Sequence, residues 1–259
     1  MRMFGRLPHD QAAVSAAPRL YDSALLQMVN PPEKIDRSQT IITPEMYGND
    51  TIGDCTAVAM LNAARAFSSI MSKTDLVVDP KAPFEFYGRC VGQPDLTRLG
   101  ETHGAVMLDV LRQQYLGGYR ISFNNDLVCN FGTVNIKNRA ALADVIARLG
   151  TLYMGVSITD SDDVNFENND PWDDDGSDTS EVIGGHATNG FWYDGLGDRD
   201  HVYVGTWARW QPATWRWVER RLKEAYGLVW RGLLPPDSAD LLGFDMNVLA
   251  RDTTNWSYA

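Results

Sequence analysis

The sequence has few cysteines, a deficit of basic residues and no long apolar run. Its three cysteines are an odd number spaced far apart, which does not indicate a disulfide framework. No stretch approaches the roughly 18 consecutive apolar residues of a membrane span, so we expect no transmembrane helix. Residues 1–20 lack the apolar core of a signal peptide, and we therefore expect no secretion by that route.

The common metal and nucleotide motifs are also missing. There is no CxxC or HExxH pair, and His103 and His201 lack the spacing of metal ligands, so we do not expect zinc. Neither a P-loop nor a GxGxxG after a strand occurs, which leaves nucleotide binding without support. The formal net charge of -11 argues against a nucleic-acid-binding surface and against docking on anionic lipid.

The negative charge is concentrated in one segment, residues 159–181. This segment holds ten of the 34 acidic residues and no Lys or Arg, so the remaining 24 acidic residues nearly balance the 23 basic ones. We expect a solvated surface loop, with a calcium site as the weaker alternative and no other cofactor. An EF-hand is excluded, because Gly176 as its central glycine would place Pro171 and Val182 at ligand positions.

Periodicity and composition predict an α+β fold with two lobes. With 44% hydrophobic and 22% charged residues, the chain has ordinary globular composition. The predicted helices are 55–72, 83–91, 104–116, 138–149 and a short one near 239–249; the predicted strands are 151–159, 182–194, 201–210 and 224–230. Helices first and strands second are not the pattern of an alternating parallel sheet.

Residues 1–45 differ from the rest of the chain. They contain five prolines and only a brief helical signal at 21–29, so they cannot form a core of their own. We expect an extended arm that packs against its own domain or a neighbouring subunit. The remainder, 46–259, is predicted to be one domain with a helical lobe at about 46–118 and a β lobe at about 119–259.

The most informative stretch surrounds Cys55. This cysteine begins a predicted helix in which Arg65 is the only charged residue, so the helix is buried and its dipole favours the thiolate. Asp54 stands at the N-cap position. The amide of Asn49 and the backbone N–H of Cys55 could together form an oxyanion hole, and Gly53 would let the loop approach the reacting centre closely.

These residues resemble the papain-like cysteine peptidase superfamily, whose nucleophile ends a Gln-Gly-x-Cys-Gly-Ser-Cys run. Here the run reads from Asn49 to Cys55 and keeps Gly53, with Asn in place of Gln. His186, in GGHATNGFWYD, lies 131 residues downstream and resembles the family's histidine stretch. The resemblance covers residues 46 to about 230. It implies Cys55 as nucleophile, His186 as base and Asn49 as oxyanion donor, on a central helix that starts at Cys55 and an antiparallel β lobe.

The third catalytic element of that family differs here. The Asn-Ser-Trp of papain-like enzymes corresponds to Gly205-Thr206-Trp207. Gly205 has no side chain to orient the imidazole, so Thr206 or a backbone carbonyl is expected to hold the ring. Trp207 and Gly53 are expected to form walls of the cleft.

Two main functions and one further alternative remain open. The first is a cysteine peptidase, or thiol amide hydrolase, acting on a peptide or protein; similarity to papain-type proteins of phage genomes suggests a phage-encoded, virion-associated enzyme. The second is a non-catalytic virion structural protein, a capsid decoration or tail component, which contacts neighbouring subunits through its arm. A cell-wall amidase of the NlpC/P60 type ranks last. We expect the protein in the host cytoplasm, the virion or both, and a cleft filled by the arm would favour the structural role.

Overall fold

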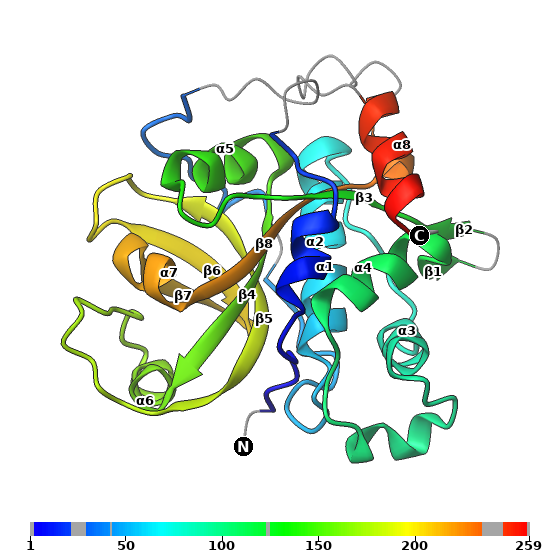
Figure 1. Cartoon of the computed structure of the whole chain (residues 1–259), viewed down its shortest axis with the longest axis horizontal. Coiled ribbons are helices and arrows are strands. Elements are labelled where there is room, and N and C mark those ends of the chain that lie inside the picture. The colour runs from blue at the N-terminus through cyan, green and yellow to red at the C-terminus, as the bar shows by residue number, and fades with distance from the viewer. Residues whose placement is uncertain (1–2, 22–29, 42, 123–124, 235–245, 258–259) are drawn as a thin grey trace.

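Helices dominate the first half of the chain and strands the second (Figure 1). The computed structural model describes residues 3–21, 30–41, 43–122, 125–234 and 246–257. The helices are α1 (Gln11–Ala16), α2 (Cys55–Met71), α3 (Ala82–Val91), α4 (Met107–Leu116), α5 (Arg139–Leu149), α6 (Asp160–Asn168), α7 (Trp215–Arg221) and α8 (Met246–Ser257), with short 3-10 helices η1 (Leu96–Glu101) and η2 (Arg231–Leu233). The strands are β1 (Tyr119–Ser122), β2 (Asn125–Leu127), β3 (Asn130–Thr133), β4 (Leu152–Thr159), β5 (Val182–Tyr193), β6 (His201–Thr206), β7 (Arg209–Thr214) and β8 (Leu222–Val229). The predicted α+β fold class is confirmed.

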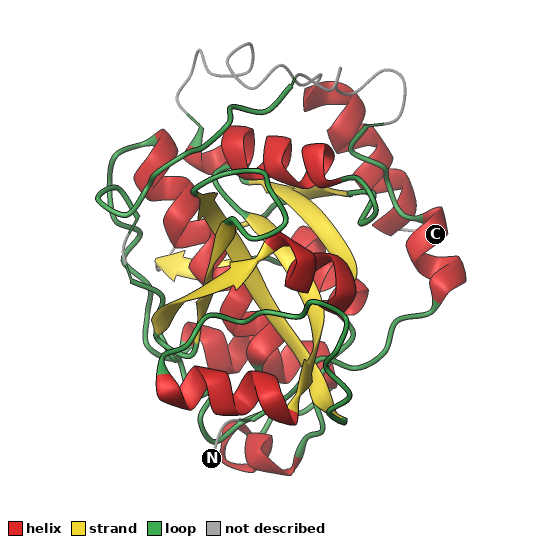
Figure 2. Ribbon diagram, turned by 90° about the vertical axis from the view of Figure 1, so that its left-hand side faces the viewer, coloured by secondary structure: helices red, strands yellow, loops and turns green. Residues whose placement is uncertain are grey.

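A six-stranded antiparallel sheet forms the centre of the second half. Its strand order is β3-β8-β4-β5-β6-β7, and β1 and β2 form a separate hairpin. Every residue of β4 is buried, since the sheet is covered on both sides, and this explains why its sequence is nearly unbroken in apolar residues. Figure 1 shows α5 and α7 on one side of the sheet and α2 on the other, and Figure 2 shows the strands in the middle of the molecule.

Helix α2 joins the helical half to the sheet. Fifteen of its 17 residues are buried, as the scarcity of charge in its sequence predicts. The side chain of Asn189 on β5 donates to the carbonyl of Ala59 at 2.7 Å, and the Tyr153 hydroxyl on β4 donates to the carbonyl of Thr56 at 3.0 Å. These bonds fix the first turns of α2 against the two central strands. Among the described residues, no helix combines the length and the apolarity needed to cross a membrane.

Several predicted boundaries were wrong, each for a local reason. The predicted strand 201–210 is interrupted, because Trp207 and Ala208 form a tight turn with positive φ. The final helix ends at 257 rather than near 249, and residues 239–245 of the predicted helix lie outside the described residues. The third predicted helix begins at 107 rather than 104, since Gly104 has a φ of +102°. Most of the helical signal at 21–29 lies outside the described residues.

The described part of the arm packs against the rest of the chain. Leu20 is fully buried, and its backbone N–H donates to the carbonyl of Thr133 on β3 at 3.0 Å. Further along, Ile35 forms a β-bridge with Tyr193 at the end of β5. The arm also contains the short helix α1, capped by Asp10, which the proline-rich sequence did not predict. Figure 1 shows the start of the chain running between the sheet and the helices.

The acidic segment 159–181 is partly helical and partly buried. It begins with α6, which a capping box between Thr159 and Asp162 initiates. Arg221 lies 3.3 Å from a carboxylate oxygen of Asp162 and 3.1 Å from one of Asp174, both of which are buried. The expectation of a solvated loop was therefore wrong for these two residues, because arginine on α7 neutralises them. Among the described residues, no group of three or more His, Cys, Asp or Glu side chains is placed to hold a metal ion.

Candidate active site

Cys55 occupies the first position of α2 and is almost completely buried. The sequence predicted that the preceding residue, Asp54, caps the helix, and this prediction was wrong. Its backbone angles, φ -100° and ψ 15°, differ from the extended conformation of a typical N-cap, and its side chain makes no cap hydrogen bond. The thiol therefore stands where free helical N–H groups and the helix dipole favour negative charge.

Strand β5, which carries His186, contacts this thiol. The backbone N–H of Ala187, the residue after His186, donates to the Cys55 sulfur at 3.3 Å. The His186 side chain is buried, and its Nε2 lies 2.6 Å from the Thr206 hydroxyl on β6. When Nε2–H donates to Thr206, Nδ1 carries the lone pair of the neutral ring. The Cys55 sulfur thus meets the strand that carries His186, a residue 131 positions away in sequence, at the boundary between α2 and the sheet.

Gly205 cannot be replaced by the family's Asn without rearrangement. A Cβ at this position would lie 2.4 Å from the ring of Phe191 and 3.0 Å from that of Trp210. The next side chain along the strand, Thr206, supplies the hydroxyl that contacts the imidazole. The adjacent carbonyl of Gly205 accepts instead from the Thr188 hydroxyl at 2.8 Å.

Trp207 covers the imidazole of His186. The two rings are stacked, with centroids 4.1 Å apart and an interplanar angle of 17°. Trp207 has a φ of 42° and Ala208 a φ of 60°, so the two-residue turn between β6 and β7 uses left-handed backbone without glycine. Such a conformation costs about 1–2 kcal/mol per residue, and the stacking of the indole on His186 and its edge-on contact with Phe166 help to hold it.

Asn49 lies in the loop before α2 and is buried. Its side-chain N–H₂ donates to the carbonyl of Ile52 at 3.1 Å and, at 3.5 Å, to the carbonyl of Met3. The backbone of Met3 in turn donates to the carbonyl of Asn49 at 3.3 Å. The predicted oxyanion donor therefore faces the first described residue of the chain.

The N-terminal segment (residues 3–9) lies across the thiol and forms β-type hydrogen bonds on both sides. The N–H of Arg6 donates to the carbonyl of Gly185 at 3.0 Å, directly before His186. On the opposite side, Ala105 donates to the carbonyl of Gly5 at 2.8 Å and accepts from the N–H of Leu7 at 3.0 Å. The segment thus joins the loop before α4 to strand β5.

Gly5 and Gly104 allow this close approach. A Cβ at Gly5 would lie 1.7 Å from the carbonyl oxygen of Gly53, and a Cβ at Gly104 would lie 2.1 Å from the carbonyl oxygen of Gly5. Any side chain at residue 5 would therefore prevent the segment from lying where it does. Gly53, predicted from sequence to be a cleft wall, contacts this segment. Next to it, the ring of Phe4 meets Trp207 edge-on, with centroids 5.9 Å apart.

Burial raises the pKa of the Cys55 thiol to about 12. Hydrogen bonds from the backbone N–H groups of Ala187 and Gly5 to the sulfur offset part of the effect. Burial also raises the pKa of Asp54, to about 8, and the Asn49 amide offsets part of that rise. At pH 7 the Asp54 carboxyl is thus mostly neutral, so it repels a Cys55 thiolate only weakly.

The other two cysteines have a different environment. Cys129 is buried and Cys90 partly buried, and burial raises the pKa of both thiols, that of Cys90 to about 12. The thiol of Cys90 has Arg89 and Asp109 as its charged neighbours. Of the three thiols, Cys55 is the one that the fold places beside an imidazole-bearing strand.

Solved structures of cysteine proteases have the same arrangement of elements. Xylellain from Xylella fastidiosa superposes with a TM-score of 0.59 at 14% identity, over 88% of this chain and 97% of xylellain. The Carica candamarcensis cysteine protease CMS1MS2, solved with E-64, gives 0.55 at 15% identity over 76% of this chain and 98% of its own. This chain has the papain-like fold. Digestive procathepsin L 3 of Tenebrio molitor gives 0.56 at 10% identity over 84% and 77%. At sequence identities this low, the superpositions establish the fold alone. Neither a family model nor a curated protein sequence matches the chain.

In this papain-like fold, the sequence did not predict which segment covers the thiol. The sequence feature that could have revealed this segment is Gly5, the only glycine among residues 3–9. It packs near two other glycines, at positions 53 and 104. Their pairing is invisible in sequence because residues 5, 53 and 104 are far apart. Burial and hydrogen bonding in the folded chain bring them together.

Proposed function

We propose that this protein is a papain-like cysteine peptidase that its own N-terminal segment holds closed. The observation that carries the proposal is the contact of the Cys55 sulfur with the strand that bears His186, together with the 2.6 Å contact between His186 and Thr206. A thiol at a helix N-terminus, a histidine and a group that fixes its ring are the parts that nucleophilic acyl transfer requires.

The reaction follows from these positions. His186 takes the proton of the Cys55 thiol, and the thiolate attacks the carbonyl carbon of a peptide bond. The imidazolium then gives that proton to the leaving amine as the C–N bond breaks, which leaves a thioester on Cys55. Water, deprotonated by His186, hydrolyses the thioester and restores the thiol.

Asn49 and the backbone N–H of Cys55 would stabilise the negative oxygen of the tetrahedral intermediate. Asn49 supports this role because its amide already donates toward a carbonyl of the covering segment, that of Met3. A substrate carbonyl in a comparable place would gain this hydrogen bond as negative charge develops on it. Donors fixed in this way contribute about 3–4 kcal/mol to transition-state stabilisation.

The N-terminal segment itself is held in a form that resists cleavage. The peptide group between Phe4 and Gly5 turns its N–H, not its carbonyl carbon, toward the Cys55 sulfur. A thiolate cannot attack an N–H, so the segment blocks the thiol without being a substrate in this position.

The test uses the full chain with Gly5→Leu, which displaces the segment, and a general mixture of fluorogenic peptides. We expect hydrolysis by Gly5→Leu, none by Gly5→Leu/Cys55→Ala, and little by the unaltered chain. The purified proteins are compared at equal concentration, with circular dichroism to establish that each is folded. Absence of Cys55-dependent hydrolysis by the folded Gly5→Leu protein would contradict the proposal.

The filled cleft also favours the second candidate, a non-catalytic structural protein that reuses the fold. The resemblance to phage-encoded papain-type proteins supports a virion context, with neighbouring subunits as partners and the host cytoplasm as the place of synthesis. In that case Gly5→Leu would remain inactive on all peptides and would instead impair assembly. Hydrolysis and particle assembly measured on the same variant separate the two candidates.

A further inference from the structure

The side chain of Arg6 enters a pocket beside the thiol. Gly155 on β4 leaves room for it: a Cβ there would lie 2.8 Å from the Arg6 Cδ and 2.6 Å from the sulfur of Met107. The Arg6 Nη1 reaches a carboxylate oxygen of Glu224 on β8 at 2.8 Å, and the Arg6 side chain is only 8% exposed. The pocket thus lies between the start of α4 and two central strands.

Glu224 is a fully buried acid at the base of this pocket. One of its oxygens accepts from the Tyr226 hydroxyl at 2.7 Å, and the other lies near Arg6 and 3.2 Å from Nδ1 of His9. A buried carboxylate without a cation is strongly destabilised. Both of these partners, Arg6 and His9, belong to the N-terminal segment, so Glu224 loses them whenever that segment leaves.

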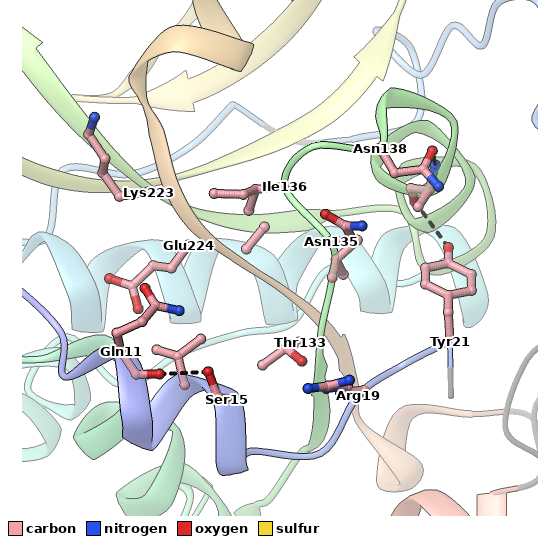
Figure 3. A pocket seen from close by; sticks show the side chains of 14 residues that line it. Gln11, Ser15, Arg19, Tyr21, Thr133, Asn135, Ile136, Asn138, Lys223 and Glu224 are labelled. Carbon is pink, nitrogen blue, oxygen red and sulfur yellow. Dashed lines mark hydrogen bonds between the residues drawn. The ribbon is translucent and has the colours of Figure 1, made fainter. Parts of the chain in front are cut away.

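Among the described residues, no ion pair joins Glu224 to a cation outside the N-terminal segment; Lys223 lines the same cavity, but Figure 3 shows its amine pointing away from Glu224. Glu224 also lines a cavity of about 500 Å³ beneath α1, shown in Figure 3, where Glu224 and Gln11 lie at one end and Tyr21 and Asn138 at the other. Arg19 lines the same cavity, away from the Glu224 end in this view. Removal of the N-terminal segment, which includes Arg6, therefore takes away the arginine that pairs with Glu224.

We propose that Glu224 is a specificity-determining residue that selects peptides with an arginine or lysine side chain in the Arg6 pocket. The inference rests on the proposed peptidase function, because the pocket opens next to Cys55. The backbone of Arg6 bonds to Gly185, the residue before His186, and the preceding residue, Gly5, faces the sulfur. A substrate whose backbone follows the same path places its basic side chain on Glu224. Neutral side chains leave the carboxylate unpaired, and acidic ones add repulsion.

Binding in trans tests this selection without requiring catalysis. The protein is the full chain with Gly5→Leu and Cys55→Ala, which exposes the cleft and cannot hydrolyse. The probe is the fluorescein-labelled hexapeptide Met-Phe-Gly-Arg-Leu-Pro, the sequence of residues 3–8, compared by fluorescence anisotropy with versions carrying Lys, Gln or Glu in place of Arg. We expect the Arg and Lys peptides to bind at least about 30-fold more tightly than the Gln peptide, and the Glu peptide to bind least.

The Glu224→Gln substitution in the same background should abolish the preference for the basic peptides. Glu219→Gln is the matched control, because Glu219 pairs with Arg139 away from the cleft, and it should keep the preference. If Gly5→Leu does not fold, Arg6→Glu replaces it, since two carboxylates at this pocket repel each other and displace the segment.

Equal binding of the Arg and Gln peptides, a preference that survives Glu224→Gln, or no binding of any peptide would overturn the selection. Because no turnover is measured, these results are independent of whether Cys55 is catalytic. A protein that prefers basic peptides but never hydrolyses them contradicts only the proposed peptidase, whereas hydrolysis without this preference contradicts only the role of Glu224.

Discussion

Displacing the N-terminal segment should make Cys55 far more reactive toward alkylation. Gly5→Leu places a Cβ where the carbonyl oxygen of Gly53 would be only 1.7 Å away, so the segment cannot return to its position. Burial raises the pKa of the Cys55 thiol to about 12. At pH 7 only about one thiol in 100,000 is then a thiolate, against about 3% for a cysteine of ordinary pKa.

The thiolate fraction therefore rises about 3,000-fold if exposure restores an ordinary pKa, and further if His186 lowers it. The assay is alkylation by iodoacetamide at pH 7, with each cysteine quantified by mass spectrometry. Cys129 is an internal reference, since it is buried away from the segment and should remain slow. Gly100→Leu is the matched control, because a Cβ at Gly100 has no heavy atom within 4 Å.

The result that refutes this reasoning is a folded Gly5→Leu protein in which Cys55 is alkylated as slowly as in the unaltered chain. The segment would then not be what protects the thiol. Equally fast labelling of Cys55 and Cys129 would indicate general unfolding, and a thermal melt of each variant identifies that case.

Three further predictions concern the surroundings of the site. In the Gly5→Leu background, Thr206→Val should lower kcat about 10- to 100-fold with little change in KM, because the imidazole loses the hydroxyl that orients it, while Thr206→Ser should keep most of the activity. Arg221→Gln should lower the free energy of unfolding, measured in urea, by about 3–5 kcal/mol, since two buried carboxylates lose their cation. Arg220→Gln, at a half-exposed position, should lower it by less than about 1 kcal/mol. Equal losses for the two variants would contradict the pairing of Arg221 with the buried carboxylates. Burial raises the pKa of Asp54 to about 8, so the folded state keeps a proton that the unfolded chain releases near pH 4. Its contribution to stability is complete below about pH 4 and is lost as pH rises toward 8, by up to about 1.4 kcal/mol per pH unit. Asp54→Asn should remove that part of the pH dependence in urea titrations, and an unchanged slope would show that another group is responsible.

The sequence by itself determined the elements whose signals are local. The uncharged run after Cys55 specifies a buried helix, and the apolar, β-branched stretches at 151–159 and 182–194 specify central strands. The spacing of Cys55 and His186 indicated the papain-like fold, which the superpositions bear out. The helix and the strands depend on composition and periodicity within one segment, so neighbours in sequence were sufficient to predict them, whereas the pairing of Cys55 with His186 came from the resemblance to a known family.

Only the tertiary structure decided what surrounds the thiol. Gly5 contacts Gly53, which is 48 positions away in sequence, and Arg6 pairs with Glu224, which is 218 positions away. No local sequence pattern specifies contacts over such separations. The acidic segment appeared solvated because its arginine partners lie on a later helix, α7. Charges, hydroxyls and glycines act through distances in space, and the burial that alters their pKa values exists only after the chain has folded. The sequence therefore indicated where a nucleophile could be, and the packing of the chain determined that this nucleophile is covered.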